Sequence, residues 1–74
     1  MGSSEHRIVS RLDDVLQERG MTLTELSRTT GLTMANLSVL KNGHAKAVRF
    51  SSLTLICDAL DCTPADLLDI GPRP

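Results

Sequence analysis

Basic side chains gather in the middle of the chain, where acidic side chains are scarce. The basic residues of the segment 22–50 are Arg28, Lys41, Lys46 and Arg49. Glu25 is the one acid of this segment, which carries a formal charge of +3, whereas residues 51–74 carry −3 and the whole chain −1. A local cluster of cations is the chemistry that phosphate contacts require. The charge pattern therefore indicates a phosphate-binding surface, although a merely solvated surface would have the same charges.

Patterns typical of catalysis or metal binding are missing from the sequence. It has no recognisable Ser-His-Asp arrangement, no glycine-rich phosphate loop and no paired carboxylates on an apolar face. Cys57 and Cys62 do not form a C-x-x-C pair, and only His6 and His44 could assist them. We expect two reduced cysteines that pack as small hydrophobic residues. The sequence thus predicts no enzyme activity, no metal site and no cofactor.

Length and composition favour one small helical domain. A chain of 74 residues with a single aromatic residue, Phe50, needs an aliphatic core, which suits a helical bundle and argues against a sheet. We expect a flexible leader over 1–6, the domain over 7–70 and a frayed tail over 71–74. No apolar run approaches the ~20 residues that span a bilayer, and no signal peptide is present. We therefore expect a cytoplasmic protein without a membrane segment and without a small-molecule ligand domain.

A first short helix is predicted within the basic segment. It begins at Thr22, because Thr22 and Glu25 have the spacing of a capping box. Leu23 and Leu26 form its apolar stripe, and Gly31 ends it where a left-handed residue is favoured.

A second short helix follows at once. Its start signal is Thr33, whose hydroxyl can accept from free amides one turn on. Leu37 and Leu40 stand three apart and face inward, and Asn42-Gly43 ends the helix. Two helices that cross at a wide angle need a small residue where they touch and a glycine in the turn. Ser27 is the small residue, so the spacing is that of a helix-turn-helix.

This pattern resembles the phage-repressor and Cro type of helix-turn-helix regulators, also called xenobiotic-response-element-like. The resemblance runs from about Leu12 to Leu68. Its most specific motifs are Thr22-Leu23-Thr24-Glu25-Leu26-Ser27, Gly31-Leu32-Thr33, Leu40-Lys41-Asn42-Gly43, Arg49-Phe50-Ser51-Ser52-Leu53 and Ala59-Leu60. It implies an all-α fold, a compact five-helix bundle of the lambda-repressor-like DNA-binding type whose second and third helices form the helix-turn-helix. It also implies a transcriptional regulator that binds double-stranded DNA.

The first helix of the bundle has two candidate starts. Residues that share one helical face favour a start near residues 4–7, and these residues are Ile8, Leu12, Val15 and Leu16. Alternatively, Ser10 with Asp13 begins a shorter helix and leaves Ile8-Val9 extended. We favour the early start, and Gly20 ends the helix in both cases.

Two further helices are predicted after the basic segment. Ser51 caps the fourth, with Phe50 packed against Leu55 as a hydrophobic staple. The apolar face of this helix consists of Leu53, Ile56, Cys57 and Leu60. Thr63 and Pro64 begin the fifth helix. The apolar residues that follow either complete the core or meet a partner, and they are Leu67, Leu68 and Ile70.

By this resemblance, the helix that begins at Thr33 reads base edges in the major groove while the helix before it crosses the DNA backbone. Its base-facing positions are Thr33, Met34, Ala35 and Val39, with Ser38 at the rim. Asn36 is the only amide of the first turn and the candidate for a bidentate contact to adenine. Its alternative role is to assist the helix cap.

Phosphate and minor-groove contacts are expected beside this helix. Arg49 matches a family position where an arginine approaches the narrow minor groove. Residues that resemble the family's backbone contacts are Asn42, His44 and Lys46. Thr22 and the free amides of Leu23 and Thr24 can form an anion site at a helix N-terminus. Each basic side chain could equally be a solvated charge.

The predicted reading surface departs from the family's common pattern. Met34, Ala35 and Val39 are apolar where the family often has glutamine, arginine or lysine. Apolar side chains cannot read guanine, but they pack on thymine methyl groups. We therefore expect an A·T-rich operator that is read partly by shape. The alternative is a protein-interaction module, antitoxin-like or antirepressor-like, that binds a protein through this apolar face.

A single small domain makes few base contacts. Two-fold dimers solve this by reading half-sites about 34 Å apart. We therefore predict a homodimer on a pseudo-palindromic operator, acting as a repressor or autoregulator in the cytoplasm in association with the nucleoid. We expect the dimer seam near Leu67, Leu68 and Ile70.

Overall fold

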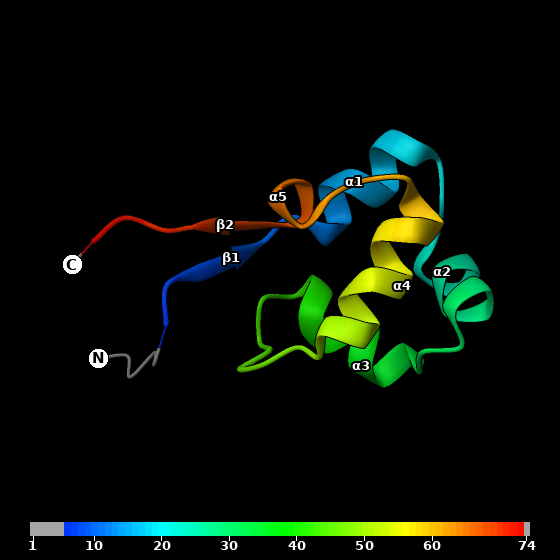
Figure 1. Ribbon diagram of the computed structural model, residues 1–74, viewed down its shortest axis with the longest axis horizontal. Helices are drawn as coiled ribbons and strands as arrows, with labels where there is room; N and C mark the ends of the chain where they lie inside the picture. The colour runs from blue at the N-terminus through cyan, green and yellow to red at the C-terminus, as the bar shows by residue number, and fades with distance from the viewer. Residues whose placement is uncertain (1–5, 74) are drawn as a thin grey trace.

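The computed structural model describes residues 6–73 of the chain. In chain order the elements are β1 (Ile8–Ser10), α1 (Leu12–Arg19), α2 (Leu23–Thr30), α3 (Met34–Lys41), α4 (Phe50–Leu60), α5 (Pro64–Leu67) and β2 (Leu68–Ile70). Among the described residues, the five helices form one body and the two strands extend from it as a ribbon (Figure 1). The ribbon makes the molecule elongated, with extents of 36 × 21 × 20 Å. Most of the predicted leader, residues 1–5, lies outside the described residues.

The core is aliphatic, as the composition predicts. Its residues are Leu12, Val15, Leu16, Leu26, Leu37, Leu40, Leu53, Ile56, Cys57, Leu60 and Leu67. Every one of the five helices contributes at least one of them. Within residues 6–73 no polar or charged residue is buried. Burial of aliphatic surface therefore holds the helices together.

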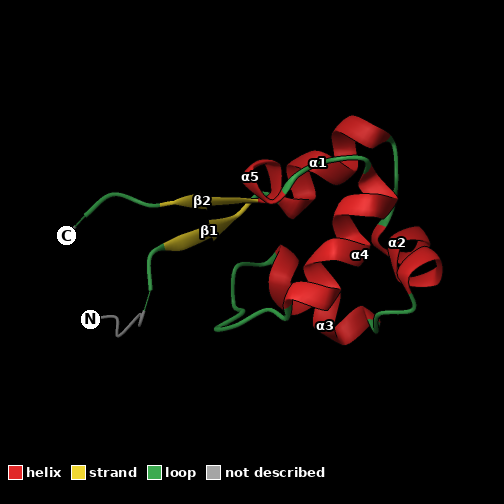
Figure 2. Cartoon of the chain, in the orientation of Figure 1, coloured by secondary structure: helices red, strands yellow, loops and turns green. Residues whose placement is uncertain are grey.

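The prediction of an all-α chain is corrected by β1 and β2, which pair in an antiparallel, two-stranded sheet. Ile8 lies opposite Ile70 and Ser10 lies opposite Leu68. Figure 2 shows both strands to one side of the helical body. The backbone hydrogen bonds between the two segments continue past the strand ends. The Arg11 amide donates to the Leu67 carbonyl oxygen at 2.7 Å.

The favoured early start of the first helix is wrong. Residues 8–10 are extended, and α1 begins at Leu12, as the shorter alternative around Ser10 predicted. The Ser10 hydroxyl accepts from the Leu12 amide at 3.3 Å, although the capping residue itself is Arg11. The helical spacing of Ile8 with the α1 core was thus coincidental. Pairing with β2 overrides the helical pattern.

The predicted start of the fourth helix is also wrong. Phe50 is already the first residue of α4, and Arg49 is the capping residue with no side-chain cap hydrogen bond. The capping residue lies two positions earlier than predicted, so Ser51 lies inside the helix. Phe50 is 85% exposed rather than packed as a staple. The predicted inward face of this helix, which starts at Leu53, is buried as expected.

The helix α5 begins as predicted, with a capping box between Thr63 and Asp66 and a proline in its first turn. It is one turn long, and Leu67 is its buried residue. The chain then turns directly into β2. The segment 71–74 was predicted as a frayed tail. Its Gly71 amide donates to the Arg7 carbonyl oxygen at 2.7 Å, which continues the pairing of the two strands. Pro74 lies outside the described residues.

Candidate nucleic-acid interface

The helices α2 and α3 meet across a short turn with buried leucines between them. Leu26 is 0% exposed and Leu37 is 1% exposed. Gly31 ends α2 with φ +79°, a left-handed conformation that a side chain would strain. These contacts and this turn confirm the predicted helix-turn-helix.

Side-chain hydrogen bonds fix the turn between the two helices. The Ser27 hydroxyl donates to the Leu32 carbonyl oxygen at 2.6 Å. The Thr30 hydroxyl donates to the Leu26 carbonyl oxygen at 2.7 Å and accepts from the Leu32 amide at 3.2 Å. Ser27 was predicted only as a small contact residue. Because its hydroxyl also holds the turn, it fixes how α3 is presented.

The predicted capping box at the start of α2 is present. The Thr22 hydroxyl accepts from the Glu25 amide at 3.1 Å, and the Thr22 amide donates to the Glu25 carboxylate at 2.9 Å. The bond from this backbone amide lowers the pKa of the Glu25 carboxyl below its ordinary value of 4.5. A lowered native pKa adds stability that is present at neutral pH and is lost as the pH falls through the lowered value. The cap of α2 should therefore weaken in acid.

Replacing Thr22 with alanine should lower the free energy of unfolding by about 1 kcal/mol, because the Glu25 amide loses its acceptor. Urea unfolding followed by circular dichroism measures this loss. Thr24→Ala is the matched control. Thr24 is exposed on the same turn, and its side chain makes no hydrogen bond within the described residues. Equal stability of the two variants would contradict the assigned cap.

The helix α3 turns its first residues to solvent. The Thr33 hydroxyl accepts from the Asn36 amide at 3.1 Å and caps the helix as predicted. Leu37 and Leu40 are buried, which leaves the other face outward. The exposed residues of that face are Thr33, Met34, Ala35, Asn36 and Val39, and Ser38 is half-buried. The first turn of α3 is therefore accessible to a large ligand.

A groove runs between α3 and the loop that leads to α4. Its volume is about 460 Å³. Four of the sequence-predicted site residues line it together, namely Asn36, Val39, Lys46 and Arg49. Ser52, from the first turn of α4, also lines it and was not predicted as a site residue. Ser52 lies within the motif Arg49-Phe50-Ser51-Ser52-Leu53, but its place in the groove depends on the path of the loop.

The loop beneath this groove is held by a residue that the sequence analysis did not assign. The His6 ring donates through Nε2 to the Ala45 carbonyl oxygen at 3.0 Å, and its Nδ1 accepts from the Ile8 amide at 3.0 Å. These two hydrogen bonds of His6 connect β1 to the middle of the loop between α3 and α4. The predicted backbone-contact residues between α3 and α4 are all exposed, and they are Asn42, His44 and Lys46.

Other predicted site residues lie apart from the groove. Thr22, Leu23 and Thr24 stand at the start of α2, and none of them lines it. Leu23 is half-buried against the core, so only its amide could meet a phosphate. Lys41 faces α1, with Nζ 3.8 Å from an Asp13 carboxylate oxygen.

The described residues offer little for metal or thiol chemistry. Residues 6–73 contain no group of three His, Cys, Asp or Glu side chains that could hold a metal ion. Burial and the neighbouring Cys57 raise the pKa of the Cys62 thiol to about 11, so the thiol stays protonated at neutral pH. Cys57 is buried, and no disulfide joins the two. No helix within this part of the chain is long and apolar enough to cross a membrane.

Comparison with known proteins agrees with this geometry. A model of the Cro/C1-type HTH DNA-binding domain matches residues 11–72. The chain belongs to this family. The resemblance stated from the sequence is thus confirmed, and the Cro/C1-type domain is a DNA-binding domain of transcriptional regulators.

Two known proteins resemble this chain, one in sequence and one in fold. The uncharacterized HTH-type transcriptional regulator YozG of Bacillus subtilis (strain 168) is 55% identical over 62 residues, which are 84% of this chain and 74% of YozG. The crystal structure of the transcriptional regulator VanUg, Form II, matches with a TM-score of 0.74 at 23% identity, over 99% of this chain and 97% of that one. At this identity the second match shows the fold alone.

Proposed function

We propose that this Cro/C1-type domain binds an A·T-rich, pseudo-palindromic operator as a homodimer and acts as a repressor or autoregulator. The observation that carries the proposal is the groove in which Asn36 and Val39 of α3 meet Lys46 and Arg49 of the following loop. A base-reading helix and phosphate-binding cations must approach DNA together. The four residues line one groove, so they can meet DNA from the same side of the molecule. The finer lambda-repressor-like arrangement of the bundle is part of the same proposal.

The proposed base contacts come from the first turns of α3. Thr33, Asn36 and the apolar Met34, Ala35 and Val39 are exposed there. Asn36 pairs with adenine through its amide, and the apolar side chains pack on thymine methyl groups. This combination favours A·T base pairs.

The proposed backbone contacts surround these residues. Lys46, His44 and Asn42 meet phosphates, Ser38 lies at the rim, and Arg49 enters the minor groove. At the start of α2, the Thr22 amide already donates a hydrogen bond to the Glu25 carboxylate. The amides of Leu23 and Thr24 therefore remain for a phosphate, beside the Thr22 and Thr24 hydroxyls. Because the ligand is chromosomal DNA, the protein should work in the cytoplasm, on the nucleoid.

A salt titration tests DNA binding directly. The logarithm of the binding constant should fall linearly with the logarithm of the salt concentration, with a slope of about −0.9 per neutralised phosphate. Arg49→Ala should weaken binding to all sites and make the slope shallower by about one unit. Fluorescence anisotropy of a labelled duplex, selected from random DNA with the wild-type protein, measures both quantities.

Arg28→Ala is the matched control for this titration. It removes the same charge from an exposed position on α2 that does not line the groove. Its slope should stay close to that of the wild type. If Arg49→Ala and Arg28→Ala gave the same slope, the groove would not be the DNA contact.

A protein ligand is the second candidate, and one specific observation favours it. Met34 is 42% exposed and Val39 is 44% exposed on α3, an apolar surface that could pack against another protein. Such an apolar contact depends little on salt. Failure to bind any duplex at low salt would favour this antitoxin-like or antirepressor-like role.

A further inference from the structure

The loop between α3 and α4, residues 42–49, carries the cations of the candidate nucleic-acid interface but few hydrogen bonds. Its first part is held to α3 by two backbone hydrogen bonds, which the amides of Gly43 and His44 donate. Beyond His44, the His6 ring makes the one hydrogen bond that reaches residues 45–48 within the described part of the chain. Two side chains of this stretch also pack against the core, those of Ala45 and Val48.

The His6 bond acts on the peptide group that leads into Lys46. The ring Nε2 donates to the Ala45 carbonyl oxygen at 3.0 Å, and this carbonyl belongs to the peptide group that joins Ala45 to Lys46. The peptide is planar and trans, so its N–H points away from the carbonyl oxygen and from His6. Fixing this plane fixes the direction in which the backbone leaves Ala45. Lys46 follows directly, and both Lys46 and Arg49 line the candidate DNA groove.

The other nitrogen of the His6 ring is bonded to β1. Nδ1 accepts from the Ile8 amide at 3.0 Å. Because an amide N–H only donates, Nδ1 is the unprotonated nitrogen, and Nε2 carries the hydrogen that the Ala45 carbonyl accepts. Between these residues, the Arg7 carbonyl oxygen accepts from the Gly71 amide at 2.7 Å, which joins the residue before β1 to the residue after β2. The imidazole therefore connects the ribbon to the loop.

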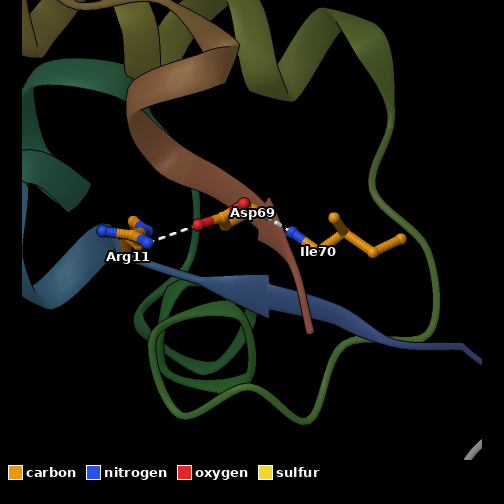
Figure 3. Close-up of polar contacts among 3 residues, drawn as sticks. All are labelled: Arg11, Asp69 and Ile70. Atoms are coloured by element: carbon orange, nitrogen blue, oxygen red, sulfur yellow. Dashed lines mark hydrogen bonds and ion pairs between the residues drawn. The ribbon is translucent and has the colours of Figure 1, made fainter. Parts of the chain in front are cut away.

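Side chains join the ribbon to α1 at its other end. The Asp69 carboxylate pairs with the guanidinium of Arg11, the capping residue of α1, as Figure 3 shows. It also accepts from the Ile70 amide at 2.7 Å. The Ile70 amide first, and Arg11 second, lower the pKa of Asp69, so the carboxylate stays charged at neutral pH. The strands from which His6 reaches the loop are thus attached to the helical body.

We propose that His6 is a positioning residue for DNA binding, because its bond to Ala45 holds the loop in the conformation that presents Lys46 and Arg49 to DNA. A loop that is already ordered loses less conformational entropy on binding, so a fixed loop binds more tightly than a loose one. His6 does not line the candidate DNA groove, and its effect on affinity passes through the loop. The inference rests on the DNA binding of the proposed function and adds the segment before β1 to the parts that determine affinity.

Two uncharged replacements separate the two bonds of His6. In His6→Gln, the amide nitrogen stands about as far from the backbone as the imidazole Nε2 and can donate to the Ala45 carbonyl oxygen. In His6→Asn, the shorter side chain can accept from the Ile8 amide, as Nδ1 does, but it does not reach Ala45. Comparing the two variants therefore isolates the bond to the loop.

His6→Asn should weaken DNA binding about threefold to tenfold, the usual effect of one lost hydrogen bond. His6→Gln should restore affinity to within about twofold of the wild type, because the loop bond is kept. Fluorescence anisotropy of a labelled duplex, selected with the wild-type protein, measures both. In a Lys46→Ala background, which already lacks a loop cation, His6→Asn should cost less affinity than it does alone.

NMR relaxation of the unbound proteins tests the loop itself. The backbone order parameters of residues 45–48 should be about 0.8 in the wild type and in His6→Gln, and should fall below about 0.6 in His6→Asn. A measurement on the wild type keeps the test decisive if a variant unfolds. The ring protons beside Nε2 of His6 should show nuclear Overhauser contacts with Ala45.

Absence of these contacts in the wild type would overturn the role of His6. Equal affinity in both variants, or an equal loss in both, would also overturn it, because the bond to Ala45 would then make no difference. A wild type that binds no duplex at low salt would refute the proposed function and this inference together. DNA binding that is indifferent to the two replacements would refute this inference alone.

Discussion

Leu37→Ala is expected to lower the free energy of unfolding by about 2–5 kcal/mol, the usual cost of removing a buried leucine side chain. Leu37 is 1% exposed and lies in the core, on the opposite side of α3 from its exposed residues. A domain of this size rarely has more than about 3–5 kcal/mol of stability. The variant should therefore be largely unfolded at 37 °C and should lose DNA binding with its fold. Urea unfolding monitored by circular dichroism measures the loss.

Val39→Ala is the control for this experiment on the same helix. Val39 is 44% exposed, so its truncation should leave the unfolding midpoint nearly unchanged. Its effect should appear instead in DNA affinity, through lost contact with thymine methyl groups. A Leu37→Ala variant that melts like the wild type would show that α3 is not anchored as described.

Asn36→Ala is expected to relax the base preference at one operator position by about 1–3 kcal/mol, the value of a bidentate amide contact to adenine. The preference at other positions should be kept. Asn36 is exposed, and its backbone amide, not its side chain, takes part in the Thr33 cap. The substitution should therefore leave the fold intact. Selection of bound sites from random DNA, with wild type and variant in parallel, measures the preference at each position.

Asn42→Ala separates base reading from general weakening. Asn42 is also an exposed amide, but it lies at the other end of α3, where we propose a phosphate contact. Its loss should weaken binding to all sites equally and leave the selected sequence unchanged. If Asn36→Ala also weakened all sites equally, Asn36 would contact the backbone or assist the cap instead of reading a base.

The helix-turn-helix could be predicted from the sequence because its signals are local. The Thr22 and Thr33 caps, the Gly31 turn and the inward leucines each act within a few residues, and the structure contains all of them. The ribbon could not be predicted this way. Its pairing joins residues 8–10 to residues 68–70, and no local signal reports a contact across that separation. The helical spacing around Ile8 even favoured the wrong element.

In the candidate site, too, local features could be predicted from the sequence and contacts between distant residues could not. The exposure of Asn36 and Val39 follows from helical geometry once Leu37 and Leu40 face inward. Their meeting with Lys46 and Arg49 depends on a loop that carries no regular pattern, so the sequence suggested these residues one by one but not the groove that unites them. The error at Phe50 has a related cause. Because α4 begins two residues earlier than predicted, Phe50 lies in solvent and does not pack against Leu55 as a staple.

Because β1 precedes the five helices and β2 follows them, the ribbon cannot close until residues 68–70 have left the ribosome. Contacts between residues so far apart in sequence form late in folding, because the entropy cost of closing the intervening loop comes first. The ribbon is therefore expected to form after the local turns and caps of the helix-turn-helix.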